Sequence, residues 1–288
     1  MRAVPRLLPI LRLLRVGTLF SPAADVLASA AVAGLPFDSS VARAMASSVC
    51  LYAAGMVWND IADRRVDRVQ RPERPLVRGD VSLPFAMTLG ALLLVLGIGL
   101  SPCRWHHGLI AALVLTYDFG SKALPWLSVP LMGSLRGLNL GTALAMPLAL
   151  DAGRSQNLLG AAICYGIYIA AVTVLGICED HQPVRGRVVV AVQTVPPIVA
   201  LLGILVVQAA PWPAPAIACL PIGWFLWRCY RVTTWQQATI RRSMMFLLLG
   251  TMLYTALLSL AAGATWAAAA IAAAILPARW IARRIALT

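Results

Sequence analysis

Long apolar runs follow one another along almost the whole chain, and each has about the length that an α-helix needs to cross a membrane. Crossing the hydrocarbon core takes about 20 residues of helix. Ten such runs occupy residues 16–35, 41–58, 84–100, 105–121, 126–150, 157–178, 188–208, 213–229, 243–262 and 264–281. The short alternating patterns of an outer-membrane barrel are absent. We therefore predict an all-α, polytopic membrane bundle of ten transmembrane helices, or nine if Gly263 does not separate the last two.

The composition agrees with a lipid-facing surface. Hydrophobic residues make up 60% of the 288 positions and charged residues 12%, whereas about a quarter of the residues of a soluble domain are charged. The six cysteines form no CxxC pair and no zinc spacing, and most lie inside apolar runs. We expect residues 1–288 to form a single integral-membrane domain.

The net charge of +13 does not indicate nucleic-acid binding, because the basic residues are dispersed in short clusters between the apolar runs. If the N-terminus is placed inside, all but four of the 24 Lys and Arg residues fall in cytoplasmic loops. The exceptions are Arg43, Arg104, Arg136 and Arg154. This asymmetry follows the positive-inside rule and predicts a protein of the bacterial inner membrane with both termini cytoplasmic.

Two polar insertions, residues 59–83 and 179–187, fall on the predicted cytoplasmic side. The first begins with Asn59, Asp60, Asp63 and Asp67, which continue the second apolar helix. At about 100° per residue, these four side chains share about a quarter of the helix circumference. Like charges one turn apart destabilise a helix, so a ligand is expected to offset the repulsion. Oxygen clusters of this kind suit Mg²⁺, which binds one or two carboxylates together with substrate phosphates.

The alternative is a solvated, charge-balanced segment in which the aspartates pair with Arg64, Arg65 and Arg68. Exposed pairs contribute only about 0–1 kcal/mol. They do not explain three aspartates on one face next to the bilayer, so metal binding is the favoured interpretation.

The run Asn59–Asp67, followed by Arg71–Leu76 and Gly79–Ser82, resembles the first signature of the UbiA superfamily of intramembrane prenyltransferases. The run Tyr117–Lys122 is similar to the tyrosine-plus-basic element of that family. The resemblance implies a helical bundle around a central cavity in which Mg²⁺ ions hold an isoprenyl diphosphate. It also implies transfer of the prenyl group to an acceptor, which the sequence does not identify.

The resemblance further implies roles for individual residues. Asn59, Asp60 and Asp63 would be metal ligands, and Asp67 would lie at the edge of the site. The candidate substrate-binding residues are Arg15, Arg64, Arg68, Asn139 and Asp67.

The second signature of the family departs from its usual form here. It places aspartates four and eight residues before a glycine, but Gln182 and Cys178 hold those positions before Gly186. The acids present are Glu179 and Asp180. Either these two bind metal through a shifted loop, or the second metal site is weak or absent.

Lys122, Tyr117 and Arg136 are the candidate catalytic residues. Lys122 is the only lysine, and it lies where a flexible charge can reach a phosphate or simply anchor the helix end. Tyr117 could stabilise an allylic cation through its ring face, although an interfacial tyrosine is equally ordinary.

Arg136 lies inside a predicted span, where a charge costs at least about 2.5 kcal/mol and usually faces a cavity or a partner. Asn139 lies one turn away on the same face, and Asp25 is a second costly charge in the first span. Substrate contact and an internal salt bridge with Asp25 both remain open.

The run Arg136–Asn139, with Arg15–Thr18 in place of the usual pattern of the first helix, resembles the divergent EboC-like branch of the superfamily. We expect a Mg²⁺-dependent prenyltransferase acting at the cytoplasmic membrane face. The alternatives are a terpene cyclase with the same diphosphate capture, and a non-catalytic transporter or scaffold.

Overall fold

The regular elements of the structure are helices. The computed structural model describes residues 7–121, 124–147, 150–180, 185–209, 213–232 and 234–285, and no strand occurs among them. The helices are α1 (Leu7–Leu13), α2 (Phe20–Ala33), α3 (Ser39–Gln70), α4 (Pro75–Arg78), α5 (Leu83–Leu100), α6 (Arg104–Gly120), α7 (Pro125–Leu140), α8 (Ala152–Asp180), α9 (Gly186–Val207), α10 (Pro213–Tyr230), α11 (Gln237–Ala261) and α12 (Thr265–Ile285). Two short 3-10 segments, η1 (Val16–Thr18) and η3 (Thr142–Ala145), complete this set.

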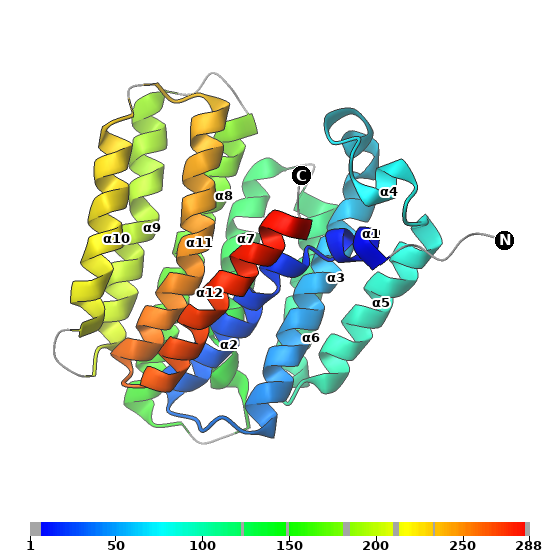
Figure 1. Ribbon diagram of the computed structural model, residues 1–288. Helices are drawn as coiled ribbons and strands as arrows, with labels where there is room; N and C mark the ends of the chain where they lie inside the picture. The colour runs from blue at the N-terminus through cyan, green and yellow to red at the C-terminus, as the bar shows by residue number, and fades with distance from the viewer. Residues whose placement is uncertain are drawn as a thin grey trace.

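The long helices run up and down in one bundle, as Figure 1 shows. Each of the ten predicted apolar runs overlaps one of these helices, which confirms the all-α membrane bundle. Among the described residues, seven helices are long and apolar enough to cross a membrane. The number of crossings stays a prediction, since α7 has only 16 residues and is shorter than most spanning helices.

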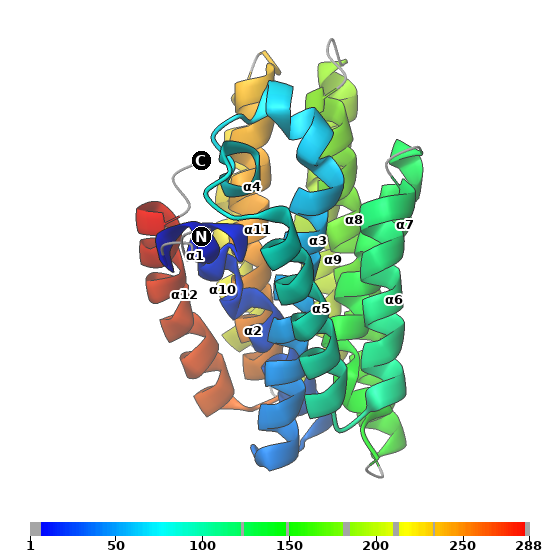
Figure 2. The same cartoon turned by 90° about the vertical axis from the view of Figure 1, so that its right-hand side faces the viewer.

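The first and last helices meet at the same end of the bundle. The Nε of Arg12 in α1 donates a hydrogen bond to the carbonyl oxygen of Ile285 in α12, at 3.1 Å. The end of α3 beyond the apolar stretch and the short helix α4 lie toward this upper end (Figures 1 and 2). An even number of crossings would produce this arrangement.

Helix α3 extends well past its apolar stretch. Its N-cap is Asp38, whose side chain accepts hydrogen bonds from the backbone N–H groups of Ser40 and Val41. It ends at Gln70, because Pro72 disfavours a helical conformation in the residue before it. The predicted helical extension through the acid cluster is confirmed, so the first half of insertion 59–83 is helix.

Helix α7 is shorter than the predicted span 126–150, and the prediction was wrong in this respect. The helix ends at Leu140 and passes into η3. There the hydroxyl of Thr142 donates to the carbonyl oxygen of Asn139 at 2.8 Å, and the N–H of Ala143 donates to Oγ of Ser29 at 2.9 Å. Backbone groups freed at the helix end thus find partners inside the protein, which makes non-helical backbone tolerable at membrane depth.

Gly263 separates the last two helices, as the sequence predicts. Its φ of 82° lies in the left-handed region that favours glycine, and its N–H donates to the carbonyl oxygen of Leu260 at 3.0 Å. Helix α11 therefore ends at Ala261 and α12 begins at Thr265.

Candidate functional site

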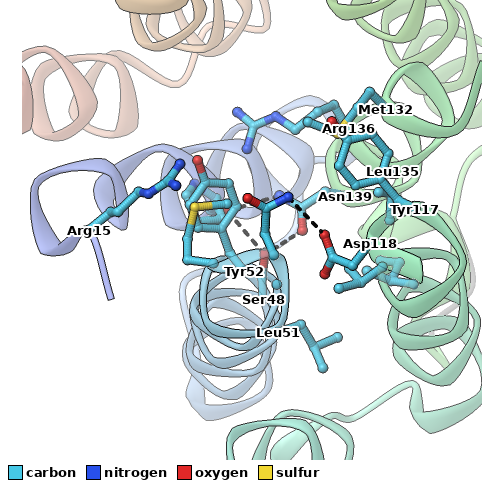
Figure 3. A pocket seen from close by; sticks show the side chains of 16 residues that line it. Arg15, Ser48, Leu51, Tyr52, Tyr117, Asp118, Met132, Leu135, Arg136 and Asn139 are labelled. Carbon is cyan, nitrogen blue, oxygen red and sulfur yellow. Dashed lines mark hydrogen bonds between the residues drawn. The ribbon is translucent and has the colours of Figure 1, made fainter. Parts of the chain in front are cut away.

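A cavity of about 180 Å³ lies between α3, α6 and α7, and we call it the α3–α6–α7 pocket (Figure 3). One end is polar, with Arg15, Asn59, Tyr117 and Asp118 on its walls. The middle is apolar, because Leu51, Met56, Ile110, Val114, Met132 and Leu135 line it. Deeper along α3 and α7 the lining becomes polar again, with Ser48, Tyr52, Arg136 and Asn139.

The predicted acid cluster divides into two parts, and arginines hold the first part. Nη1 of Arg74 lies 2.8 Å from Oδ1 of Asp60 and 2.6 Å from Oδ2 of Asp67. Nη2 of Arg15 lies 3.0 Å from the same Asp60 oxygen. Both carboxylates are buried. Burial raises the pKa of the Asp67 carboxyl above its ordinary value, while the Arg74 guanidinium acts in the opposite direction.

These partners differ from the ones that the charge-balanced alternative names. Arg65 and Arg68 are exposed, and Arg64 is half-buried. The sequence motif contained Arg74, but spacing along α3 alone did not single it out, because Arg74 follows the helix in a turn.

The second part of the cluster faces α6. Nδ2 of Asn59 donates to Oδ1 of Asp118 at 3.3 Å. Asp63 and Asp118 both lie close enough to Tyr117 for their charges to act on its hydroxyl group. Asp118 is buried, and the sequence analysis missed it. The signal was present, because an acid inside an apolar helix is a costly charge that usually faces a cavity or a partner.

A second cavity, of about 520 Å³, adjoins the first at Arg15, and we call it the arginine cavity. Its charged lining consists of Arg12, Arg15, Arg71, Arg74, Arg241, Asp60, Glu73 and Glu179. Five cations against three acids give it an excess of positive charge. The cavity also brings residues of both polar insertions to one place, Asp60 from the first and Glu179 from the second.

Glu179 and Asp180 have different surroundings. Glu179 is buried, and Nη2 of Arg241 lies 2.7 Å from its Oε1. Asp180 is exposed and does not line either cavity.

The described residues contain no group of three Asp, Glu, His or Cys side chains placed to hold a metal ion. The predicted ligands Asn59, Asp60, Asp63, Glu179 and Asp180 are therefore not gathered into one set, and their role stays a prediction. Mg²⁺ needs only one or two carboxylates when substrate phosphates complete its coordination. Asn59, Asp63 and Asp118 supply oxygen atoms of this kind on the side of the cluster that faces α6.

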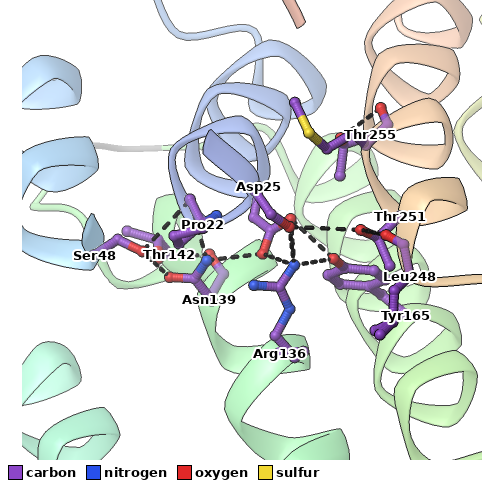
Figure 4. Close-up of polar contacts among 12 residues, drawn as sticks. Pro22, Asp25, Ser48, Arg136, Asn139, Thr142, Tyr165, Leu248, Thr251 and Thr255 are labelled. Atoms are coloured by element: carbon purple, nitrogen blue, oxygen red, sulfur yellow. Dashed lines mark hydrogen bonds and ion pairs between the residues drawn. The ribbon is translucent and has the colours of Figure 1, made fainter. Parts of the chain in front are cut away.

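A buried polar cluster lies at the deep end of the α3–α6–α7 pocket (Figure 4). Nη2 of Arg136 lies 3.1 Å from Oδ2 of Asp25 and also donates to Ser21 and Tyr165. Nδ2 of Asn139 donates to Asp25 at 2.9 Å. The internal salt bridge therefore exists, and Arg136 and Asn139 line the pocket as well.

Only some of the other candidate residues line one of the two cavities. Tyr117 and Arg15 line the pocket, as candidate site residues should. Four further predicted site residues line neither of the two cavities, namely Asp63, Arg64, Asp67 and Arg68. Lys122 lies outside the described residues.

Comparison with known proteins identifies the family. The UbiA prenyltransferase family matches residues 20–187, which is more than half of the chain. The chain belongs to the UbiA prenyltransferase family. It is an integral membrane protein, as the resemblance of its acid motif to that superfamily implies. Its place in the EboC-like branch stays a prediction.

Two curated relatives illustrate the similarity. The polyprenyl transferase ausN of Aspergillus calidoustus is 32% identical over 161 residues, 51% of this chain and 42% of that protein. The digeranylgeranylglyceryl phosphate synthase of Methanoculleus marisnigri is 30% identical over 179 residues, 59% of this chain and 61% of that protein. The chain thus spans about half the length of these relatives.

A solved structure shares the fold. The UbiA homolog from Archaeoglobus fulgidus bound to DMAPP and Mg²⁺ superposes with a TM-score of 0.54 at 13% identity. The match covers 85% of this chain and 98% of that one. At this identity the likeness shows the fold alone.

Proposed function

We propose that this UbiA protein transfers an isoprenyl group from an isoprenyl diphosphate to an acceptor in a Mg²⁺-dependent reaction. The whole chain acts as one domain in the bacterial inner membrane, with the arginine cavity on the cytoplasmic face. The observation that carries the proposal is the α3–α6–α7 pocket, where oxygen ligands stand at the polar end of an apolar space. Its shared wall with the arginine cavity, at Arg15, puts excess positive charge beside that end.

The arginine cavity suits a diphosphate leaving group. Departure of diphosphate develops negative charge on its oxygens, and preorganised cations stabilise that charge at the transition state. Arg15 is already oriented by Asp60 and borders both cavities. Arg12 and Arg71 add charge from the flanking segments.

Asn59, Asp63 and Asp118 are the residues that we assign to the metal. Mg²⁺ bound there would neutralise phosphate oxygens and tie the diphosphate to the protein. Asp118 orients Asn59 through the hydrogen bond between them. Asp60 and Asp67 serve instead to hold Arg74 and Arg15 in place.

The apolar walls protect the carbocation that ionisation produces. Leu51, Ile110 and Val114 offer water no side-chain hydrogen-bond partner, which disfavours the water that would otherwise capture the cation before an acceptor does. The Tyr117 ring lies at the boundary between the polar end and these walls, where its face can stabilise an allylic cation.

The relatives support the same reaction class. One relative is a polyprenyl transferase and another is a digeranylgeranylglyceryl phosphate synthase, and the Archaeoglobus fulgidus homolog was solved with DMAPP and Mg²⁺. We leave the acceptor of this chain unassigned.

One observation favours a second candidate, a non-catalytic transporter or scaffold. Two of the motif's three aspartates are bound by arginine, so these acids are stabilised without metal.

Product analysis separates the candidates. The purified protein in lipid nanodiscs is incubated with Mg²⁺, labelled isoprenyl diphosphates and membrane extract, and the products are resolved by chromatography. A prenylated acceptor is the expected product. A cyclic hydrocarbon or alcohol would instead identify a cyclase, and unchanged diphosphate would identify the transporter or scaffold.

A further inference from the structure

A third cavity lies in the second half of the bundle, lined mainly by α9, α10 and α11, and we call it the α10–α11 groove. Its volume is about 320 Å³, and α12, which crosses α11 obliquely in Figure 1, adds Ile275 and Arg279 to its wall. Its described lining shares no residue with the α3–α6–α7 pocket or the arginine cavity. The groove is therefore separate from the site assigned to the reaction.

The groove opens at the outer surface of the bundle, and its interior is apolar. Trp224 and Phe246 line it and are exposed at that surface. Two tyrosines form part of the wall, but the hydroxyl of Tyr168 donates to the carbonyl oxygen of Leu247 at 2.6 Å, and that of Tyr254 to Ala161 at 3.2 Å. Because both hydroxyls are engaged by the backbone, the tyrosines offer an occupant only their rings.

The length of the groove matches one leaflet of a bilayer. Along α11 it extends from Phe246 to Leu257, and eleven residues of helix rise about 16 Å. The hydrocarbon core of a membrane is about 30 Å thick, so one leaflet contributes about 15 Å. A single acyl chain that runs from its headgroup to the middle of the bilayer covers this distance.

The Phe246 end of the groove is the end of the bundle that holds the arginine cavity. Arg241, in the first turns of α11, pairs with Glu179 in that cavity. Helix α12 reaches the same end, because a Cβ atom on Gly17, two residues after Arg15, would lie 2.7 Å from the backbone nitrogen of Ala282. A headgroup at this end would therefore lie where the polar segments of the chain begin.

Arg279 gives the groove a positive charge. It is the charged residue of the described lining, and it lies one turn before Ala282 on α12. Its side chain is exposed, and none of the ion pairs within the described part of the chain involves it. An anionic group at the groove thus meets a cation whose charge no acid of the described chain compensates.

Arg228 supplies a second cation beside the same end. Its guanidinium carbon lies 4.6 Å from the ring centroid of Phe246, and that ring packs edge-on against Trp224 with centroids 5.3 Å apart. Nη1 of Arg228 is buried and has no hydrogen-bond partner among the described residues. A buried donor without an acceptor is costly, and a phosphate oxygen would supply the acceptor.

We propose that the α10–α11 groove binds an anionic phospholipid of the surrounding membrane, with one acyl chain along α11 and the phosphate held by Arg279 and Arg228. Basic pockets between membrane helices recognise acidic headgroups in this way. The bound lipid would join α10, α11 and α12 at their lipid-facing side. This inference is independent of the proposed function, because the groove lies outside the catalytic site.

The test compares two lipids that differ only in headgroup charge. Phosphatidylglycerol and phosphatidylcholine with identical acyl chains are titrated into the full chain in detergent, and bound lipids are counted by native mass spectrometry. The first phosphatidylglycerol is expected to bind at least tenfold more tightly than the first phosphatidylcholine. Equal affinities would overturn the inference.

A double variant tests the headgroup contacts. Arg228→Gln with Arg279→Gln should reduce the preference for phosphatidylglycerol to less than threefold. The matched control is Arg65→Gln with Arg104→Gln, which removes the same charge from two exposed positions outside the groove and should keep the preference. A preference that survives in the first variant, or that falls equally in both, would show that the headgroup is not bound here.

A third variant tests the chain contacts and leaves both arginines in place. Leu253→Trp fills the groove from α11 with a larger apolar side chain and should weaken binding of the first phosphatidylglycerol at least fivefold. Phosphatidylglycerol with six-carbon chains should bind the wild type at least tenfold more weakly than the long-chain lipid, because it buries less apolar surface. Unchanged binding in both measurements would place the lipid outside the groove.

Discussion

Nη1 of Arg74 lies 2.6 Å from Oδ2 of Asp67, and both side chains are largely buried, at 13% and 3% exposure. The same guanidinium nitrogen also contacts Asp60. An arginine in the turn after α3 thus locks the acid motif to the segment that follows it.

Replacing Arg74 by Met should therefore destabilise the fold. Removing one partner of a buried pair leaves an uncompensated charge and typically costs about 3–5 kcal/mol. Thermal unfolding in detergent micelles is expected to show a clearly lowered Tm.

The matched control is Arg78→Met. Nε of Arg78 lies 3.3 Å from Asp80, but the two side chains are 55% and 35% exposed. An exposed pair contributes about 0–1 kcal/mol, so the Tm of Arg78→Met should stay close to that of the wild type. Similar shifts in both variants would contradict a structural role for Arg74.

Asp63→Asn should strongly slow Mg²⁺-dependent release of diphosphate. The change keeps the shape of the side chain but removes the negative charge that we assign to the metal, and losing one such electrostatic contact typically slows a reaction about 10²–10³-fold. The diphosphate released from geranyl diphosphate is converted to phosphate by pyrophosphatase, and the phosphate is measured. Asp80→Asn is the control, because Asp80 is exposed and pairs with Arg78 outside the acid cluster. Undiminished release by Asp63→Asn would remove this residue from the site.

Glu179→Gln should impair turnover more than Asp180→Asn does. Glu179 lines the arginine cavity and holds Arg241, whereas Asp180 is exposed. Steady-state rates of the two variants under saturating Mg²⁺ provide the comparison. A larger loss in Asp180→Asn would mean that the shifted second signature acts through Asp180.

Asp25→Leu and Arg136→Met should each destabilise the bundle, and the double variant should recover much of the loss. Each single change leaves a buried charge without its partner, while the double change substitutes an apolar pair. Thermal unfolding of the three variants gives the interaction free energy between Asp25 and Arg136. Additive losses would show that the two residues act independently.

A reporter fused after Thr288 should report a cytoplasmic location. The contact between Arg12 and Ile285 puts the ends of α1 and α12 on one side of the bundle, and the positive-inside rule makes that side cytoplasmic. A second reporter inserted at Gly153 should report the opposite side. A periplasmic signal from the C-terminal fusion would contradict the proposed orientation.

Local patterns in the sequence predicted the helices well. Apolar runs specify spanning helices directly, and the extension of α3 through Asp63 followed from the absence of helix breakers before Pro72. The turn at Gly263 is likewise a property of a few adjacent residues.

Tertiary contacts escaped prediction because spacing along one helix says nothing about what packs against it. Arg74 reaches Asp67 only because a turn folds it back, and Asp60 meets Glu179 in one cavity across more than a hundred residues of chain. The early end of α7 depends on Ser29 from another helix. The pairing of Asp25 with Arg136 could be suspected from their cost in the membrane, but only the fold brings them together.

The most direct test of the central claim is the metal dependence of substrate binding. Geranyl thiolodiphosphate is titrated into the wild type and into the variant Asn59→Ala with Asp63→Asn, each with Mg²⁺ and with EDTA. We predict tight binding only for the wild type with Mg²⁺, and a loss of at least a hundredfold in the other three cases. Equal affinity with EDTA, or in the variant, would contradict a metal-diphosphate site at Asn59 and Asp63.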